Sequence, residues 1–252
     1  MQIKNGQFWL GDCLELMKDI PDGSVDMILC DLPYGTTACK WDTVIPFEPL
    51  WKQYWRVAKP NAPIVLTASQ PFTTALVASN FDDYAYEWIW IKSRPTGFAN
   101  AKKQPLRNVE HIHVFYRKPP VYNPQGLVRI NKMVKNSKSA GGDTVRGDTK
   151  ESAGNGSLRT SGKEYLQEWT NYPRQVLNIA HDSTKGIHPT QKPVALFEYL
   201  IKTYTNEGET VLDNCAGSGT TAVAAENTNR RWICIEQEPE YYNKACMRVM
   251  TQ

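Results

Sequence analysis

Residues 210–221 read TVLDNCAGSGTT, and this stretch decides the fold. A short apolar run leads into a loop that contains Gly217 and Gly219, and the loop opens a segment with helical character, 220–228. Strand, glycine turn and helix in succession are typical of α/β proteins, in which ligands bind beyond the carboxyl ends of strands. Glycine allows positive φ and lets a ligand approach the backbone closely. We therefore examine this loop as a ligand site.

The glycine loop alone does not establish a ligand site, because a tight turn between strand and helix also needs glycine. It lacks the third glycine of the dinucleotide fingerprint and the Gly-Lys-Ser/Thr of a P-loop. Two carboxylates strengthen the case: Asp213 precedes the loop, and Glu236 ends the next apolar run, 231–236. An acid at the second position can accept hydrogen bonds from ribose hydroxyls. The combination favours a nucleoside-type cofactor.

A second strand end carries side chains that a turn does not require. The apolar run VDMILC (25–30) is followed by DLPYG (31–35). Proline and glycine suffice for a turn, and Asp31 could serve as a turn former. The carboxylate of Asp31 and the ring of Tyr34 are better explained as groups placed for chemistry.

The rest of the chain predicts an α/β fold with about seven strands. Strands are expected at 8–10, 25–30, 62–67, 86–92, 110–116, 210–213 and 231–236. Helices are expected at 47–55, 71–80, 193–205, 220–228 and 239–250. Strands that alternate with helices form mostly parallel sheets. No helical pattern separates 86–92 from 110–116, so these two are expected to form an antiparallel hairpin with a long loop, 93–109.

Composition limits the class of protein. The 252 residues are 41% hydrophobic and 22% charged, as in ordinary globular proteins. No apolar run approaches the ~20 residues of a membrane span, and the first residues show no signal peptide, so we expect a cytoplasmic protein without membrane contact. The six cysteines form no Cys-x-x-Cys pair and only four histidines occur, which argues against structural zinc. We expect no metal.

Residues 117–175 interrupt the α/β pattern. They are poor in apolar residues and rich in Gly, Ser, Thr, Asn and Lys, so we expect an insertion that buries little. Between 117 and 163, ten Lys and Arg accompany three acidic residues. This excess fits a polyanion partner, and it fits equally a solvated insertion whose charge serves solubility. The predicted parts are 1–116, 117–175 and 176–252.

Five motifs, taken in order, resemble those of the permuted β-group of DNA amino-methyltransferases. They are GDC (11–13), LCDLPYG (29–35), HPTQKP (188–193), DNCAGSGTT (213–221) and CIEQEPEYY (234–242). The resemblance covers roughly 1–116 and 186–250. It implies a Rossmann-like methyltransferase fold, S-adenosylmethionine as cofactor, and a target-recognition region at 117–175.

The resemblance also implies roles for individual residues. The catalytic tetrapeptide, usually DPPY, corresponds to Asp31, Leu32, Pro33 and Tyr34. Cofactor contacts are expected at Asp12, Asp31, Thr190, Lys192, Asp213, Cys215, Gly217, Gly219, Thr220 and Glu236. Among these, Glu236 matches the ribose-binding acid, Asp12 matches an acid near the adenine, and Thr190 and Lys192 match the segment that holds the methionine end.

This chain departs from the family pattern at two places. Leu32 replaces the first proline of the tetrapeptide, which keeps the main-chain carbonyl but no longer fixes φ. Asn214 and Cys215 replace the usual proline and phenylalanine of the cofactor loop. The second change would remove an aromatic ring that packs against the cofactor.

The implied chemistry is methyl transfer to an exocyclic amine. Asp31 would accept one amine N–H and the Leu32 carbonyl the other, which frees the nitrogen lone pair and stabilises the positive charge that develops there. Tyr34 would stack on a base flipped out of the duplex. Aspartate at this position resembles adenine-N6 enzymes, whereas serine is commoner in cytosine-N4 enzymes.

The expected function is therefore methylation of adenine N6 in double-stranded DNA. A cytosine-N4 DNA enzyme, an adenine-N6 RNA enzyme and a non-catalytic nucleic-acid-binding protein on the same scaffold remain alternatives. A homodimer and a cognate restriction endonuclease as partner also remain open. Predicted DNA contacts are Phe98, Lys132, Lys135, Lys138 and Arg146.

Overall fold

The computed structural model describes residues 1–37, 39, 42–135, 164–181 and 191–251. The chain divides into two compact units. The first comprises Met1–Asn123 and Arg174–Gln252, and the second comprises Pro124–Pro173. The second unit lies inside the predicted insertion 117–175. Residues 117–123 belong to the first unit, where the amide of Asn123 donates to the Thr203 carbonyl at 2.7 Å.

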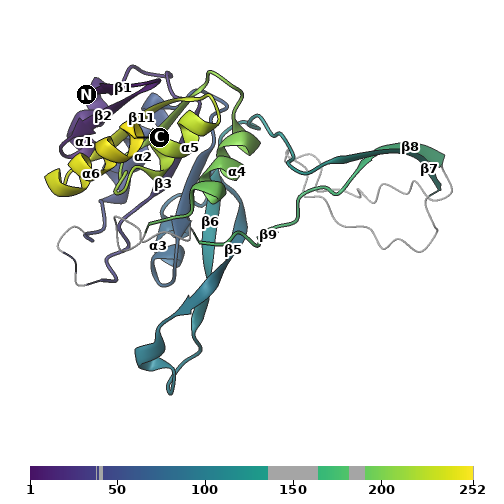
Figure 1. Cartoon of the computed structure of the whole chain (residues 1–252), viewed down its shortest axis with the longest axis horizontal. Coiled ribbons are helices and arrows are strands. Elements are labelled where there is room, and N and C mark those ends of the chain that lie inside the picture. The colour runs from purple at the N-terminus through teal and green to yellow at the C-terminus, as the bar shows by residue number, and fades with distance from the viewer. Residues whose placement is uncertain (38, 40–41, 136–163, 182–190, 252) are drawn as a thin grey trace. The chain divides into compact units, whose positions relative to one another are not determined.

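A nine-stranded sheet forms the centre of the first unit, in the order β1-β2-β11-β10-β3-β4-β6-β5-β9 (Figure 1). Its strands are β1 (Gln2–Ile3), β2 (Gly6–Leu10), β3 (Met27–Asp31), β4 (Ile64–Ala68), β5 (Tyr84–Thr96), β6 (Arg107–Phe115), β9 (Val176–Leu177), β10 (Thr210–Asp213) and β11 (Arg231–Glu236). Strands β2, β11, β10, β3 and β4 run parallel, whereas β6 is antiparallel to both β4 and β5. The predicted fold class and its antiparallel hairpin are confirmed, and two short edge strands are added.

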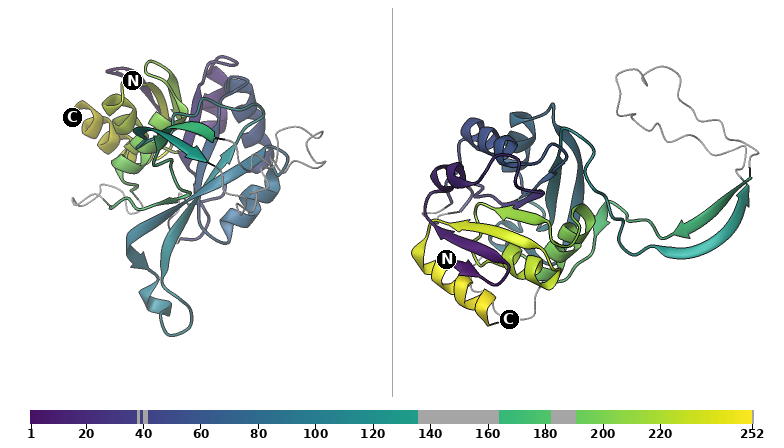
Figure 2. Two further views of the ribbon diagram at one scale, coloured as in Figure 1. Left: turned by 90° about the vertical axis from the view of Figure 1, so that its right-hand side faces the viewer. Right: turned by 90° about the horizontal axis from the view of Figure 1, so that it is seen from above.

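Helices cover both faces of this sheet (Figure 2). They are α1 (Cys13–Leu16), α2 (Phe47–Val57), α3 (Phe72–Ser79), α4 (Val194–Tyr204), α5 (Thr220–Asn227) and α6 (Pro239–Met250). A short 3-10 helix, η1 (Met17–Asp19), follows α1. Within the described chain, no helix is both long and apolar enough to cross a bilayer.

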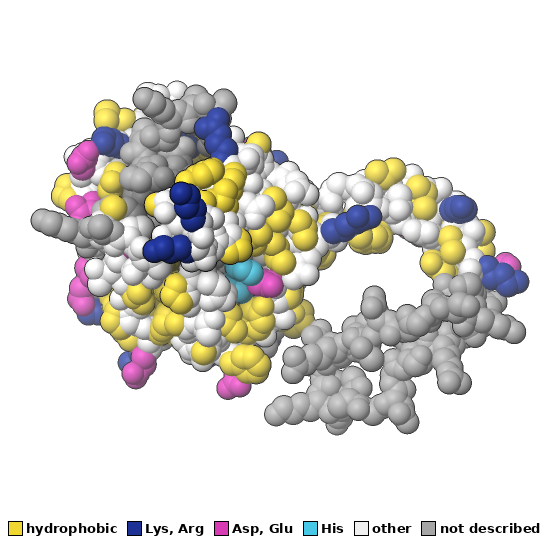
Figure 3. Space-filling view, turned by 90° about the horizontal axis from the view of Figure 1, so that it is seen from below, with side chains coloured by type: hydrophobic (Ala, Val, Ile, Leu, Met, Phe, Trp, Pro, Cys, Tyr) yellow, Lys and Arg dark blue, Asp and Glu magenta, His cyan; other side chains and the backbone are white. Residues whose placement is uncertain are grey.

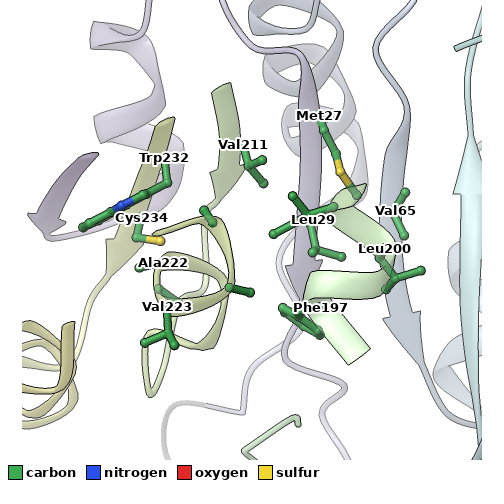
Figure 4. Packing of buried hydrophobic residues seen from close by; sticks show 14 of the residues in the cluster. Met27, Leu29, Val65, Phe197, Leu200, Val211, Ala222, Val223, Trp232 and Cys234 are labelled. Carbon is green, nitrogen blue, oxygen red and sulfur yellow. The ribbon is translucent and has the colours of Figure 1, made fainter. Parts of the chain in front are cut away.

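The two faces of the sheet build separate cores. Apolar side chains of α4, α5 and α6 form one core, and those of α1, α2 and α3 form the other. Figure 4 shows the first, where Phe197 and Leu200 of α4 lie against Leu29 and Val65 of the sheet. Strand β3 is buried along nearly its whole length, which explains its unbroken apolar sequence.

Strands β10 and β3 are neighbours in the sheet, but the chain segments that follow them lead to opposite faces of it. Helix α5 follows β10 and packs on one face, whereas α2 follows β3 and packs on the other. Such a switch point leaves a crevice beyond the carboxyl ends of the two strands. Asp213 and Asp31 are the last residues of these strands, so the topology brings their side chains to one crevice.

The β5–β6 hairpin is longer than the sequence predicted. The expected loop 93–109 is partly strand, because β5 extends to Thr96 and β6 begins at Arg107. A 3-10 helix, η2 (Phe98–Asn100), lies at the tip. Figure 1 shows the two strands projecting beyond the rest of the sheet.

The second unit contains an antiparallel pair, β7 (Val128–Lys135) and β8 (Glu164–Thr170), which the sequence did not predict. Most side chains of both strands are exposed, so no alternation of apolar and polar residues marked them. Figure 3 shows hydrophobic and basic side chains interspersed along this unit. The guanidinium of Arg129 lies over the ring of Trp169, 5.9 Å from its centroid.

Candidate active site

A cavity of about 560 Å³ lies at the carboxyl ends of the parallel strands. Residues from both predicted strand ends line it, including Asp31 and Tyr34 from the first and Asp213, Gly217 and Glu236 from β10, its loop and β11. Two segments more than 150 residues apart, as the numbering shows, therefore meet at one site.

Most other predicted site residues belong to the same cavity. Its lining also includes Asp12, Leu32, Pro33, Lys192, Cys215 and Thr220. Gly219 is not part of the lining; it adopts φ +73° at the start of α5. Thr190, Lys138 and Arg146 lie outside the described residues.

The predicted DNA contacts that the structure describes do not line this cavity. Phe98 lies in η2 at the hairpin tip and is largely exposed. Lys132 and Lys135 are exposed residues of β7 in the second unit.

Glu236 holds the glycine loop from the neighbouring strand. Its two carboxylate oxygens accept hydrogen bonds from the amides of Gly217 and Glu238, at 2.7 and 2.8 Å. Each oxygen keeps a lone pair for a further donor, since a carboxylate offers about four acceptor sites. Burial raises the pKa of Glu236, while these amides oppose the change. Glu236 thus fixes the geometry of the glycine loop and can still accept hydrogen bonds from a ligand in the cavity.

Asp213 orders the same loop from within. Its carboxylate accepts hydrogen bonds from the Cys215 amide, at 3.0 Å, and from the Thr221 hydroxyl. Only 2% of Asp213 is exposed, and burial raises its pKa to about 6 despite these donors. The acid that the sequence placed beside a ligand is therefore occupied mainly in shaping the loop.

Asp12 has a defined local role. Its Oδ1 accepts hydrogen bonds from the amides of Leu14 and Glu15, at 2.8 and 3.1 Å, and so caps the short helix α1. The preceding amide, of Gly11, donates to the Glu236 carbonyl at 3.0 Å. These contacts fix Asp12 at the cavity wall next to β11.

Asp31 is the centre of a dense hydrogen-bond network. Oδ1 accepts from the Tyr34 hydroxyl at 2.8 Å and from the Thr67 hydroxyl, and Oδ2 accepts from Nζ of Lys192 at 2.7 Å. Thr67 is the partner of Asp31 across β3 and β4. Three donors leave about one acceptor site of the carboxylate for a ligand.

Lys192 bridges two carboxylates. Its ammonium lies 2.7 Å from Oδ2 of Asp31 and 2.8 Å from Oε1 of Glu110. Burial would lower the pKa of Lys192, but these two acids raise it, so the ammonium stays charged. Burial likewise opposes ionisation of Glu110, yet Lys192 and, at 3.5 Å, Lys92 lower its pKa. The predicted contact of Lys192 with the cofactor carboxylate stays a prediction.

Tyr34 is held at both ends. Its ring stacks on Phe72 of α3, with centroids 5.1 Å apart and planes 21° apart. Its hydroxyl lies within hydrogen-bond distance of Asp31, of Thr67 at 3.0 Å and of Glu110 at 3.1 Å. The ring was predicted as an open stacking face, and the structure shows that it is also an anchor of the network.

Sequence reasoning missed Glu110 and Thr67. Site residues were predicted only at the ends of the strands that lead into the two motif loops and of β11. Thr67 lies near the end of β4, and antiparallel β6 brings residues of its amino-terminal half to the same end of the sheet. Cross-strand pairing then places Glu110 opposite Trp90 of β5. An acid in a strand whose remaining residues include the apolar Val109, Ile112, Val114 and Phe115 was the available signal.

Asp42 was also missed. Its carboxylate accepts hydrogen bonds from the amides of Gly35, Thr36 and Thr37, at 2.9, 2.9 and 2.6 Å. Burial opposes ionisation of Asp42, but the donors outweigh it and lower its pKa. This residue fixes the chain that follows the tetrapeptide and so supports the position of Tyr34.

The cavity has the size and the hydrogen-bond acceptors that a nucleoside ligand needs. Small-molecule sites typically enclose roughly 300–1,000 Å³, and this one falls within that range. Glu236 offers acceptors beside a loop with positive φ at Gly217, where no β-carbon limits the approach of a ligand.

Comparison with known proteins agrees with this geometry. A family model described as "DNA methylase", N6_N4_Mtase, matches residues 25–247. Type II methyltransferase M.HpaI of Haemophilus parainfluenzae is 25% identical over 94% of this chain and 72% of its own length. Type II methyltransferase M.BglII of Bacillus subtilis is 28% identical over 93% of this chain and 66% of its own length.

Solved structures share the fold. The complex of M1.HpyAVI with S-adenosylmethionine superposes with a TM-score of 0.65 at 24% identity, covering 97% of this chain and 98% of that one. The cytosine-N4-specific PvuII DNA methyltransferase gives 0.69 at 17% identity, covering 98% and 87%. The family match spans most of the chain and includes both strand ends that form the cavity. The chain therefore belongs to the N6/N4 DNA methylase family, whose members depend on S-adenosylmethionine.

Proposed function

We propose that this protein transfers a methyl group to the N6 amine of adenine in double-stranded DNA. The observation that carries the proposal is the state of Asp31, a carboxylate with three donors and about one remaining acceptor site at the cavity wall. That site suits an amine N–H, and the adjacent Leu32 carbonyl is the natural acceptor for the second N–H. Two such acceptors stabilise positive charge on the amine nitrogen as it is methylated.

The chain's own residues account for binding and orientation. When bound, S-adenosylmethionine supplies an electrophilic methyl group, and Glu236, Gly217 and Asp12 would hold it. Tyr34, fixed by Phe72 and by its hydroxyl, offers a ring for a base that has left the duplex. Stacking of ~1–3 kcal/mol is comparable with the unstacking cost of a few kcal/mol.

Lys192 and Glu110 are positioning residues in this proposal. Lys192 holds Oδ2 of Asp31, and Glu110 shares the ammonium, so Lys192 is not neutralised by Asp31 alone. The arrangement orients Asp31 and leaves its last acceptor site open to the amine. Ammonium and carboxylates form charge-assisted hydrogen bonds, which are stronger and more directional than neutral ones.

The second unit would contact the DNA. Its exposed side chains combine cations, among them Lys132 and Lys135, with apolar residues such as Trp169. Cations give salt-dependent affinity for phosphates, and the other side chains can read base edges. Phe98, exposed at the hairpin tip, remains a proposed contact of the first unit. A homodimer and a cognate restriction endonuclease as partner are further hypotheses for this protein.

A transfer assay tests the proposal. Purified protein, S-adenosylmethionine with a labelled methyl group and duplex DNA of mixed sequence are incubated, and the DNA is digested to nucleosides. The expected product is N6-methyladenine, absent with the Asp31→Ala variant, which should still bind the cofactor. A parallel reaction contains RNA in place of DNA, and label in the RNA with none in the DNA would contradict the choice of substrate.

Cytosine-N4 methylation is the second candidate. It is favoured by the likeness in fold to the PvuII enzyme, which is described as cytosine-N4-specific. The same digest separates the two, because label in N4-methylcytosine alone would replace adenine as the target. Aspartate at position 31, where serine is commoner in cytosine enzymes, is the reason to place adenine first.

A further inference from the structure

Three potential metal ligands gather on the β5–β6 hairpin, away from the cavity. Glu87 lies on β5 and is the cross-strand partner of His113 on β6. His111 is two residues from His113 in the same strand, so strand geometry puts both imidazoles on one face. Their rings are parallel within 2°, with centroids 5.8 Å apart.

The distances match those of a small tetrahedral site. Oε2 of Glu87 lies 2.9 Å from Nδ1 of His111 and 3.7 Å from Nδ1 of His113. The ligand atoms of the three residues all lie within 4.8 Å of one another. Bonds of about 2.1 Å to a tetrahedral zinc ion separate its ligand atoms by roughly 3.4 Å. The two oxygen–nitrogen distances bracket this value, so small side-chain rotations would bring all three ligands onto one ion.

His113 has no other explanation in the described structure. It is 1% exposed, and neither of its ring nitrogens has a hydrogen-bond partner among the described residues. Buried polar groups are normally satisfied, so each exception calls for a cause. Glu87 and His111 form a hydrogen bond with each other, whereas His113 has no hydrogen-bond partner among the described residues.

We propose that Glu87, His111 and His113 bind a divalent transition-metal ion, with zinc as the first choice. Two imidazoles and one carboxylate form a donor set that zinc uses, with a fourth position left for water or another ligand. Imidazole nitrogens favour Zn²⁺ over the hard ions Mg²⁺ and Ca²⁺. The sequence predicted no metal, because it has no Cys-x-x-Cys pair and only four histidines. The register of the hairpin brings Glu87 to the His-x-His pair.

This site is distinct from the candidate active site. Side chains alternate along β6, so His111 and His113 point to the opposite face from Glu110. The proposed ion would link β5 to β6, the strands that carry Lys92 and Glu110. Its expected effect is to stabilise the hairpin, and it takes no part in methyl transfer.

Metal titration of the whole protein tests the proposal. The protein is stripped with a chelator, dialysed, and titrated with Zn²⁺ by calorimetry; one ion per chain is expected. Addition of Zn²⁺ should raise the melting temperature, whereas Mg²⁺ should not. Co²⁺ should give a tetrahedral spectrum without a sulfur charge-transfer band, because no cysteine belongs to the site.

Variants locate the site. Glu87→Gln and His111→Gln alter partly exposed side chains and are chosen because replacement of buried His113 endangers folding. Each should weaken Zn²⁺ affinity at least tenfold, and His181→Gln, a histidine outside the cluster, should not. Failure of the stripped protein to bind Zn²⁺ would overturn the proposal, as would equal affinity in wild type and both cluster variants.

Discussion

At the scale of single residues, Glu110 shows how a buried acid can influence a group that it does not touch directly. It is 6% exposed and pairs with Lys192, which in turn holds Asp31. If Glu110 were neutral, the ammonium would have Asp31 as its closest charged partner. The ammonium of Lys192 would then neutralise more of the negative charge of Asp31, the carboxylate proposed to accept a hydrogen bond from the amine.

We predict that Glu110→Gln lowers the turnover number by roughly 10- to 100-fold, which corresponds to about 1.4–2.8 kcal/mol in the barrier. Cofactor affinity should change less than turnover, since no contact of Glu110 with the glycine loop is found among the described residues. Steady-state kinetics with saturating DNA measure the effect. Glu48→Gln, at an exposed position of α2, is the matched control. Weaker cofactor binding with normal turnover at saturation would refute a positioning role.

Asp213 links the glycine loop to pH. Its pKa is raised from 3.8 to about 6 by burial, so the folded state holds the proton more tightly than the unfolded state. The contribution of this group to stability is complete below about pH 3.8 and is lost as pH rises through 6. The change corresponds to a free energy on the order of 3 kcal/mol.

The Asp213→Asn variant lacks this titration. Its free energy of unfolding, relative to that of wild type, should therefore rise between pH 4 and pH 7. Urea unfolding at both pH values, without cofactor, gives the comparison. A difference between variant and wild type that stays constant with pH would show that Asp213 titrates normally.

At the scale of helices and strands, periodicity explains what could be predicted. Strands such as β3 and helices such as α4 are long enough, and buried enough, for their apolar patterns to identify them. The two-residue strands β1 and β9 and the four-residue α1 are too short to show a period. In the site, the prediction covered residues at the ends of β3, β10 and β11, and it missed Thr67 on parallel β4 and Glu110 on antiparallel β6.

The start of α5 offers a prediction about glycine. Gly219 has φ +73°, and a β-carbon there would meet Cβ of Ala245 at 3.1 Å, so both conformation and packing oppose a side chain. Gly208 has φ +79° with nothing within 4 Å of its virtual β-carbon. Gly208→Ala should cost about 1–2 kcal/mol for the left-handed backbone alone.

Gly219→Ala should cost more than Gly208→Ala, because α6 must move to admit the methyl group. It should also weaken cofactor binding, since the shift occurs beside the loop. Urea unfolding and a cofactor titration of both variants measure these effects. Equal destabilisation by the two substitutions would mean that α6 moves to admit the methyl group without a loss of stability.

At the scale of the whole molecule, the sequence is organised as a closed body with an inserted unit. All residues of both cores belong to the first unit, from segments before and after the insertion. The strands β7 and β8 of the second unit expose most of their side chains, and none of the described residues of this unit belongs to either core. Composition had predicted such a segment, but strands with exposed residues on both faces leave no pattern by which β7 and β8 could be recognised.

Replacement of residues 124–173 by a short Gly-Ser linker should therefore leave the first unit folded. We expect cooperative unfolding and cofactor affinity close to those of the full chain, because the cores and the cavity lining are retained. Affinity for duplex DNA should fall, together with methyl transfer.

A milder test is the full-length double variant Lys132→Gln, Lys135→Gln. If both lysines contact phosphates, the slope of log affinity against log salt should decrease by about 1.8. An unchanged slope in the double variant, with unchanged DNA affinity in the shortened chain, would place the DNA-binding surface on the first unit instead.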